Sequence, residues 1–214
     1  APATTYDGKI FLEEPYKLAT SPNGNGGWFS SLKNAGLLDL IHENGIEWLN
    51  VFAVDNVLQR IADPCFIGAT ITENRSVGAK VVCKNHPDEK VGVMCLKDNH
   101  PSIVEYYELT PELRDAVDED GEPAYNFGVI LNYLFKESEL EDICENTLPL
   151  HIVEKKIPYI DDAGTLIKPE EPNGYKFETL ILDMIQMMDT CLPFEVERDK
   201  EFAPIKNKTG IDSV

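Results

Sequence analysis

The sequence predicts an α/β fold built on a mixed sheet, with a parallel core and an antiparallel edge. Residues 50–54 form an apolar run that ends in Asp55 and Asn56, which is typical of a strand buried on both faces. Residues 9–54 read as strand, glycine-rich loop, helix and strand, the order of a βαβ unit with a right-handed crossover. Residues 78–106 hold three strand candidates joined by short polar links, which predicts antiparallel hairpins.

The first part of the chain supplies the elements of the expected βαβ unit. Residues 9–13 form a short strand candidate, and Ser21–Gly27 has three glycines in four positions. Glycines let main-chain amides approach a ligand closely, although a structural turn is the commoner reason for such a cluster. Apolar residues at helical spacing predict a helix over 28–44, with Gly45 as its stop.

Asp55 stands at the carboxyl end of the apolar run. In open α/β sheets the ligand crevice lies beyond such strand ends, so a rigid element would deliver this carboxylate to a substrate or a metal. The alternative is that Asp55 caps a helix that starts at Val57, because Asp is a favoured cap residue.

The rest of the chain alternates between strand and helix patterns. Asn126 and Asn132 stand out in an apolar stretch as amides that need partners if they are buried. The expected helices are a short one beginning at Thr110–Pro111, one over 138–144 and one over 175–190, and residues 65–72 form a short helix or a turn. The expected strands are 78–83, 92–96, 103–106, an edge strand or extended segment over 150–160 that contains Pro158, and 194–198.

Composition limits the function classes. With 214 residues and 43% hydrophobic content, the chain can bury a sizeable core, most simply as one domain, and is long enough for an enzyme. Its net charge of −19 argues against nucleic acid or an anionic membrane as a partner. No run reaches the roughly 18 apolar residues of a membrane span, and the start lacks signal-peptide features. Five cysteines without a C-x-x-C pair predict buried thiols and a cytoplasmic location.

The remaining polar residues favour phosphoryl or nucleotidyl chemistry. The sequence contains no G-x-S-x-G, no H-E-x-x-H and no spaced Cys/His set for zinc, and the four histidines are interpreted as surface residues. An acid at a strand end, a Gly/Asn loop and lysines in apolar or extended contexts fit a reaction that depends on positioning and charge neutralisation. These lysines are Lys80, Lys155, Lys156 and Lys206. Each, taken singly, reads as an exposed solubilising charge.

A series of short motifs runs in order along nearly the whole chain. The segments are Asp7–Ile10, Ser21–Gly27, Val54–Asn56, Ala62–Gly68, Gly78–Val82, Val104–Tyr106, Tyr125–Gly128, Lys155–Tyr159, Lys168–Gly174 and Pro204–Asn207. In this order they resemble the eukaryotic UDP-N-acetylglucosamine pyrophosphorylases. No single motif decides the resemblance, but the ordered series is highly specific.

The resemblance implies uridylyl transfer from UTP to N-acetylglucosamine 1-phosphate with Mg²⁺, giving UDP-N-acetylglucosamine and pyrophosphate on a Rossmann-like mixed sheet of the nucleotide-sugar transferase type. By motif, Asp55 would hold the metal, while Lys156 and Lys206 would face the phosphates. The remaining roles implied are uridine contacts for Gly24 and Asn25, an N-acetyl contact for the backbone of Gly78, and sugar-hydroxyl contacts for Glu105 and Asn126.

The departures from the family pattern concern the ends of the chain and two positions inside it. The family's phosphate loop precedes the Asp7–Ile10 motif and has no counterpart here, and the family continues beyond Pro204–Asn207. Residues 1–207 are therefore expected to be the central-to-C-terminal part of the catalytic domain, inactive alone and with an incomplete sheet, and 208–214 a tail or the start of a further region. Asn23 stands where an Asp is usual, and Val129 replaces an amide.

Two other functions compete with this reading. One is a UDP-sugar pyrophosphorylase for an unacetylated hexose, and the other is a noncatalytic nucleotide-sugar binding module. Gly78 followed by the small Ala79 would leave room for an acetyl group, which favours the acetylated sugar.

Overall fold

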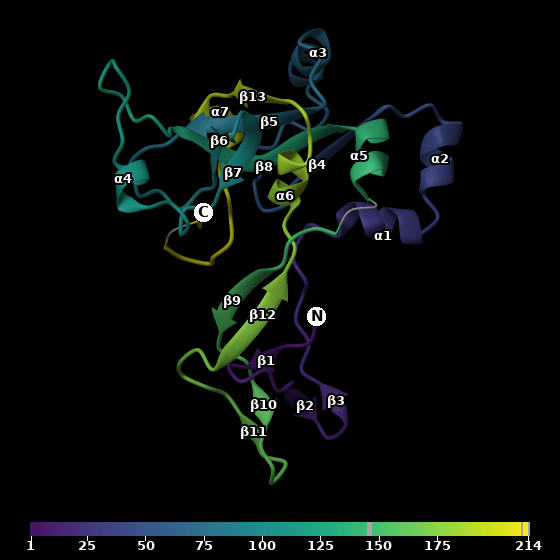
Figure 1. Cartoon of the computed structure of the whole chain (residues 1–214), viewed down its shortest axis with the longest axis vertical. Coiled ribbons are helices and arrows are strands. Elements are labelled where there is room, and N and C mark those ends of the chain that lie inside the picture. The colour runs from purple at the N-terminus through teal and green to yellow at the C-terminus, as the bar shows by residue number, and fades with distance from the viewer. Residues whose placement is uncertain (145–146, 211, 214) are drawn as a thin grey trace. The chain divides into compact units, whose positions relative to one another are not determined.

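The computed structural model describes residues 1–144, 147–210 and 212–213. The chain divides into two compact units, each made from two segments of sequence (Figure 1). The first unit comprises Ala1–Leu37 and Asn146–Met184, and the second comprises Leu38–Glu145 and Ile185–Val214. In the described part of the chain, no helix is long and apolar enough to cross a membrane.

A six-stranded mixed sheet forms the centre of the second unit. Its strand order is β13-β5-β8-β6-β7, and β4 pairs with β8 in addition. The strands are β4 (Trp48–Phe52), β5 (Val77–Cys83), β6 (Val93–Lys97), β7 (His100–Val104), β8 (Phe127–Lys136) and β13 (Cys191–Glu195). The pairing of β13 with β5 is parallel, and the other pairings are antiparallel. The prediction of an α/β fold with a mixed sheet and antiparallel strands is confirmed. The expected parallel core is wrong, because the parallel pair of β13 with β5 lies at one edge and the strands around β8 are antiparallel.

The ten-residue strand β8 organises this sheet because it pairs with β5 along one side and with two strands along the other. Residues 132–136 pair with β4, whereas Gly128 pairs with β6. The two parts of β8 are separated at Leu131, whose φ of 50° lies in the left-handed region. Such a backbone angle is uncommon outside glycine and is found at bulges and functional sites. It turns the Leu131 carbonyl toward Ala53, whose N–H donates to it at 2.9 Å.

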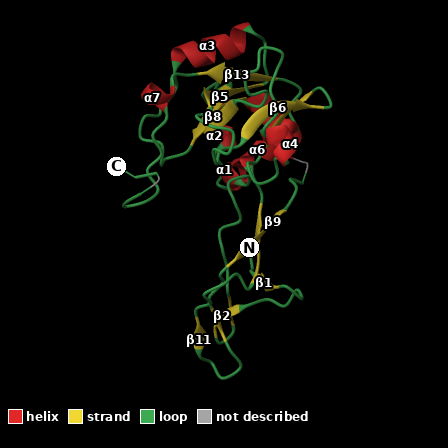
Figure 2. Cartoon of the chain, turned by 90° about the vertical axis from the view of Figure 1, so that its left-hand side faces the viewer, coloured by secondary structure: helices red, strands yellow, loops and turns green. Residues whose placement is uncertain are grey.

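Helices surround the sheet of the second unit. They are α2 (Leu38–Glu43), α3 (Pro64–Thr72), α4 (Pro111–Arg114), α5 (Glu137–Cys144) and α7 (Arg198–Glu201). Helix α3 lies along the β5–β13 side of the sheet (Figure 2), where the rings of Phe66 and Phe194 are 5.3 Å apart. Asp63 caps α3 by accepting from the Cys65 N–H at 3.1 Å, and Pro64 occupies the first turn.

The first unit is built from short antiparallel pieces. Strands β1 (Thr4–Thr5), β12 (Gly174–Glu178) and β9 (His151–Lys155) form one sheet, and β2 (Leu12–Glu14) with β3 (Lys17–Leu18) and β10 (Tyr159–Ile160) with β11 (Leu166–Ile167) form two-stranded pairs. Its small core contains Ala3, Phe11, Ala19 and Ile157, with Tyr159 packed against them. Helix α1 (Trp28–Asn34) belongs to this unit, and α6 (Ile181–Gln186) runs from it into the second.

Three sequence-based predictions of local structure are wrong. The expected βαβ unit does not form, because the strand near residue 12 pairs with β3 while β4 pairs with β8, and that second pairing is antiparallel. The expected helix over 28–44 is interrupted at Gly36, whose φ of 71° is accessible to glycine at low cost. The expected helix over 175–190 is strand β12 followed by the short helix α6, because its first apolar residues alternate at strand spacing.

The cysteines also differ from expectation. Cys65 and Cys83 are exposed, and Cys95 and Cys191 are partly buried. The prediction of buried thiols is therefore wrong for the first two, since Cys65 lies on the outer surface of α3. The side chain of Cys144 lies outside the described residues.

Candidate functional site

Asp55 and Lys206 come together in the second unit although they are far apart in the sequence. Strand β4 ends at Phe52, and Asp55 lies in the turn beyond it. The Asp55 carbonyl accepts from the Ile205 N–H at 2.8 Å, which fixes the neighbouring Lys206. The Lys206 Nζ then lies 3.6 Å from Asp55 Oδ2, with side-chain exposures of 57% and 29%. Both charged groups are therefore open to a ligand.

The buried amide of Asn56 joins this turn to the C-terminal segment. Its Oδ1 accepts from the Ala203 N–H at 2.8 Å, and its Nδ2 donates to the Glu201 carbonyl at 2.8 Å. At 3% exposure, Asn56 has both ends of its side chain satisfied by backbone groups. Because no described helix begins at Val57, the alternative of Asp55 as a helix cap is wrong.

A buried ion network holds the C-terminal segment that carries Lys206. Lys80 on β5 is fully buried, and its Nζ lies 2.9 Å from Asp63 Oδ2 and also contacts Glu201 Oε2. Arg60 lies 3.8 Å from Asp63 and 3.7 Å from Glu201. Lys80 was a candidate phosphate-binding lysine by sequence, but its charge is already matched by two carboxylates. It ties α3 and α7 to the sheet.

The ionisation of Asp63 depends on this network. Burial alone would raise its pKa, but hydrogen bonds from the Lys80 ammonium and the Cys65 N–H hold the pKa below the usual range. The carboxylate therefore stays charged at neutral pH inside the protein.

Glu105 lies just beyond the end of β7, where β6 and β8 also converge. Gly92 lies beside it: a Cβ at Gly92 would lie 3.8 Å from the Glu105 carboxyl carbon, 3.1 Å from Ile103 Cγ2 and 3.3 Å from Val129 Cγ2. The Val129 N–H donates to the Gly92 carbonyl at 2.8 Å. Nearby in sequence, the Asn126 Oδ1 accepts from the Lys84 N–H at 2.9 Å. The Glu105 carboxylate thus lies beside the backbone at Gly92, which carries no side chain.

Gly78 occupies a different position. It lies inside β5, paired with Leu134 of β8 and Leu192 of β13. A Cβ there would come within 2.5 Å of Thr70 Oγ1 and 2.7 Å of the Phe66 ring. The missing side chain at Gly78 thus makes room for helix α3, whereas the backbone at Gly92 packs closely against Ile103 and Val129 and lies beside Glu105. Gly92 is not among the site residues predicted from the sequence, and it lies directly before β6.

The Ser21–Gly27 loop lies in the first unit and is held by the segment between β12 and α6. Gly24 has a φ of 84°, and a Cβ there would lie 2.1 Å from the Thr179 carbonyl oxygen. The Gly26 N–H donates to the same oxygen at 2.9 Å. The Asn25 Oδ1 accepts from the N–H of Ile181, the first residue of α6, at 2.9 Å. Close backbone packing accounts for the glycines, and capping accounts for Asn25.

Lys156 follows β9 in the first unit and is exposed, as is its neighbour Lys155. The predicted site residues therefore fall into separate groups. The second unit holds Asp55 with Lys206, and Glu105 with the Asn126 segment. The first unit holds Gly24, Asn25 and Lys156.

Two histidines interpreted as surface residues have defined partners. His151 Nε2 lies 2.9 Å from Asp183 Oδ2, with 18% of its side chain exposed, so the surface prediction is wrong for it. His42 is half exposed and faces Glu137 and Glu141. These contacts join residues far apart in sequence, so spacing gave no signal for them.

Comparison with known proteins assigns the chain to a family. The model of the UTP–glucose-1-phosphate uridylyltransferase family matches residues 1–211. The chain belongs to this family. It is 42% identical over 214 residues to the UDP-N-acetylhexosamine pyrophosphorylase-like protein 1 of Mus musculus, and 39% identical over 219 residues to the UDP-N-acetylglucosamine pyrophosphorylase of Saccharomyces cerevisiae.

Solved structures agree with the fold. The chain aligns over its full length with the crystal structure of the uridine diphosphate N-acetylglucosamine pyrophosphorylase of Trypanosoma brucei, with a TM-score of 0.85 and 26% identity, covering 44% of that chain. The alignment with the mouse relative includes 99% of this chain and 42% of that relative. The alignment with the yeast relative includes 98% of this chain and 45% of that relative. The resemblance seen in the sequence motifs is confirmed, and the chain spans less than half of the relatives it matches.

Proposed function

We propose that the chain forms the sugar-binding and metal-binding part of a uridylyltransferase that makes UDP-N-acetylglucosamine and pyrophosphate from UTP and N-acetylglucosamine 1-phosphate. Membership of the family and the names of the mouse and yeast relatives support this. The observation that carries it is the open pair of Asp55 and Lys206, 3.6 Å apart at the end of β4. The alternative of an unacetylated hexose 1-phosphate keeps some support from the family description, which names glucose 1-phosphate.

The proposed reaction joins a phosphate oxygen of the sugar phosphate to the α-phosphorus of UTP. The bond from that phosphorus to the oxygen bridging to the β-phosphate breaks, and pyrophosphate leaves with the bonding electron pair. Mg²⁺, when bound, would neutralise charge on the phosphates during this exchange. Asp55 fits such an ion because Mg²⁺ takes one or two protein carboxylates together with substrate phosphates and water. Lys206 adds a second positive charge at the same place.

Glu105 and Asn126 would read the sugar hydroxyls, since a carboxylate accepts and an amide both donates and accepts. For the acetyl contact, the geometry favours Gly92 over Gly78, because Gly92 is the glycine beside Glu105. Gly24, Asn25 and Lys156 remain proposed contacts for the uridine and phosphates. Because four described cysteines are free thiols, we also infer a reducing, cytoplasmic location, and the net charge of −19 favours small-molecule partners over nucleic acid or membranes.

The test is the substitution Asp55→Asn in the complete protein that carries this chain, with Asp212→Asn as a matched control. Asp212 also lies near Lys206, at 3.9 Å, but outside the strand-end turn. Losing the Asp55 charge should lower the rate of pyrophosphate release about 10²–10³-fold, with the melting temperature unchanged. The control should keep most of its activity. An Asp55→Asn enzyme with nearly full turnover would contradict the proposed role.

A further inference from the structure

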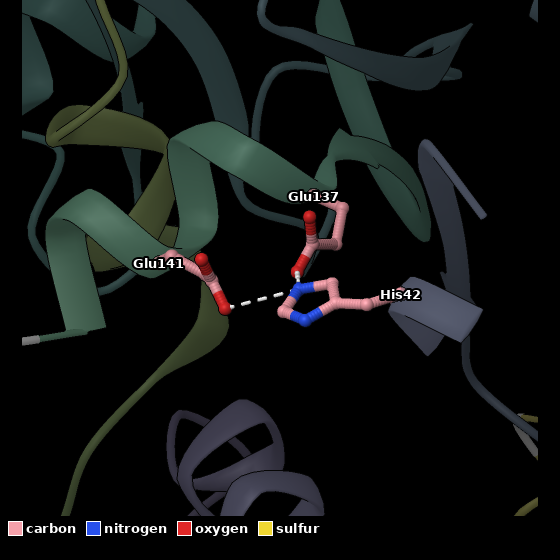
Figure 3. A group of neighbouring side chains, drawn as sticks. All are labelled: His42, Glu137 and Glu141. Carbon is pink, nitrogen blue, oxygen red and sulfur yellow. Dashed lines mark hydrogen bonds and ion pairs between the residues drawn. The ribbon is translucent and has the colours of Figure 1, made fainter. Parts of the chain in front are cut away.

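Three metal-ligating side chains meet on the surface of the second unit, away from the proposed site residues. They are His42 from α2 and the pair Glu137 and Glu141 from α5 (Figure 3). His42 Nε2 lies 3.1 Å from Glu137 Oε1 and 3.3 Å from Glu141 Oε1. All three donor atoms lie within 4.8 Å of one another.

A single hydrogen on the imidazole nitrogen cannot form good hydrogen bonds to both carboxylates. A neutral or charged imidazole carries at most one hydrogen on Nε2, yet two carboxylate oxygens lie at nearly equal distances from that nitrogen. The Glu137 side chain is 9% exposed, so its charge has little water around it and needs a close cation. Asp39 on α2 adds further negative charge near the imidazole.

Two of the three separations between the donor atoms are close to those in a metal site. In a tetrahedral zinc centre with bonds of about 2.0–2.2 Å, neighbouring ligand atoms are about 3.3–3.6 Å apart. The two nitrogen–oxygen distances, 3.1 and 3.3 Å, are close to this. The spacing of Glu137 and Glu141 by four residues puts both carboxylates on one side of α5. Figure 3 shows one oxygen of each carboxylate directed at the same imidazole nitrogen of His42.

We propose that His42, Glu137 and Glu141 bind a divalent transition metal, with Zn²⁺ as the favoured ion, and that the metal clips α2 to α5. One nitrogen and two oxygens suit zinc, whereas Mg²⁺ prefers oxygen ligands in an octahedral set. A fourth position is left for water. Helix α2 begins where the chain enters the second unit, and α5 is the last described helix before it leaves. The clip would therefore fix both of these segments within the unit.

The chain should bind one equivalent of Zn²⁺ at this site. After dialysis against a chelator, the protein is titrated with Zn²⁺ in competition with a chromophoric chelator, and with Mg²⁺ in parallel. We expect zinc to bind at least tenfold more tightly than magnesium and to raise the melting temperature. His42→Asn should abolish both effects, and Glu141→Gln, at a position 43% exposed and so tolerant of change, should weaken binding at least tenfold.

A matched control separates this site from ordinary surface binding. His86 Nδ1 pairs with Asp88 at 2.7 Å but has no second carboxylate in its pair, so His86→Asn should bind zinc like the unsubstituted chain. Co²⁺ in place of zinc should give a visible spectrum without thiolate charge-transfer bands, which excludes the exposed Cys65 and Cys83. The proposal would be overturned by any of three results: equal zinc affinity of His42→Asn and the unsubstituted chain, thiolate bands with Co²⁺, or no zinc binding at micromolar concentration. The three side chains would then form a proton-linked ion pair.

Discussion

At the scale of single residues, the charged groups of the second unit divide into exposed and buried sets with different roles. Lys206 has 57% of its side chain exposed, whereas the side chain of Lys80 is fully buried between two carboxylates. An exposed ammonium can meet a phosphate, but a buried and matched one cannot without breaking its ion pairs. In the sequence alone both are lysines in apolar or extended contexts, and only their surroundings in the structure distinguish their roles.

Lys206 should act on the transition state more than on substrate binding. Charge on the transferring phosphoryl group is redistributed during the reaction, so Lys206→Ala in the complete protein should lower kcat more than it raises KM. Lys206→Arg should recover part of kcat, because it restores the charge. Lys208→Ala, two residues away, is the matched control. Steady-state kinetics that showed a raised KM at unchanged kcat would make Lys206 a ground-state binding residue.

Lys80 should matter for stability. Lys80→Met leaves the buried carboxylates of Asp63 and Glu201 without their main cation, and breaking such a pair costs about 3–5 kcal/mol. Lys97→Met, at an exposed position on β6 in the same unit, should change stability by less than about 0.5 kcal/mol. A Trp28→Phe background leaves Trp48 on β4 as the fluorescent reporter of the second unit in urea unfolding.

The same network predicts an acid dependence. Because the folded pKa of Asp63 is held below its unfolded value, its contribution to stability is present above the unfolded pKa and is lost as pH falls through the folded pKa. The Lys80→Met variant should therefore lose less stability on acidification than the unsubstituted chain. Equal stability of Lys80→Met and the unsubstituted chain at neutral pH would contradict this account of the network.

At the scale of elements, two glycines on opposite sides of β8 serve different purposes. Gly78 is where α3 approaches β5, and Gly92, just before β6, is where the backbone lies beside Glu105. The small residue in the Gly78–Val82 motif was first interpreted as room for an acetyl group. The packing of Phe66 and Thr70 gives it a structural reason that the motif alone could not reveal.

One pair of variants distinguishes the roles of the two glycines. Gly78→Ala overpacks the α3 interface and should destabilise the second unit by about 1–3 kcal/mol. Gly92→Ala meets the tips of Ile103 and Val129 at 3.1 and 3.3 Å, so it should cost less stability but weaken binding of UDP-N-acetylglucosamine. Urea unfolding and calorimetry on both variants provide the comparison. A stable Gly78→Ala with lost sugar binding would restore the original assignment.

The sequence predicted many of the elements but only part of their pairing. Strands β5, β6 and β7 lie at the three strand candidates of residues 78–106, and the predicted antiparallel hairpin between the second and third is confirmed. The expected hairpin between the first and second is wrong, because β8 lies between β5 and β6. The pairing partner of β4 could not be predicted from the sequence, because an apolar run is compatible with an antiparallel strand beside β8 as well as with a parallel strand. The Asp55–Lys206 pair could be assigned by motif, whereas its support by Asn56, Lys80 and Glu201 depends on long-range contacts.

At the scale of the whole molecule, the chain carries 38 acidic and 19 basic residues yet is proposed to bind anionic nucleotides. Such a surface repels free nucleotides at long range, so binding must come from local cations and from neutral sugar contacts. The proposed sugar contacts Glu105 and Asn126 are both within this chain, which spans 42% of the mouse relative. The sugar end of the product should therefore contribute most of the affinity.

The most direct test is a calorimetric titration of the 214-residue chain with UDP-N-acetylglucosamine, UDP-glucose and UTP, each with Mg²⁺. The account predicts affinity in that order, and Glu105→Gln should weaken the binding of UDP-N-acetylglucosamine about 10–100-fold, the effect of losing one hydrogen bond to a charged group. Glu119→Gln, an exposed acid beyond α4, should leave it unchanged. Tighter binding of UTP than of UDP-N-acetylglucosamine, or the same affinity in Glu105→Gln, would contradict the assignment of the sugar site.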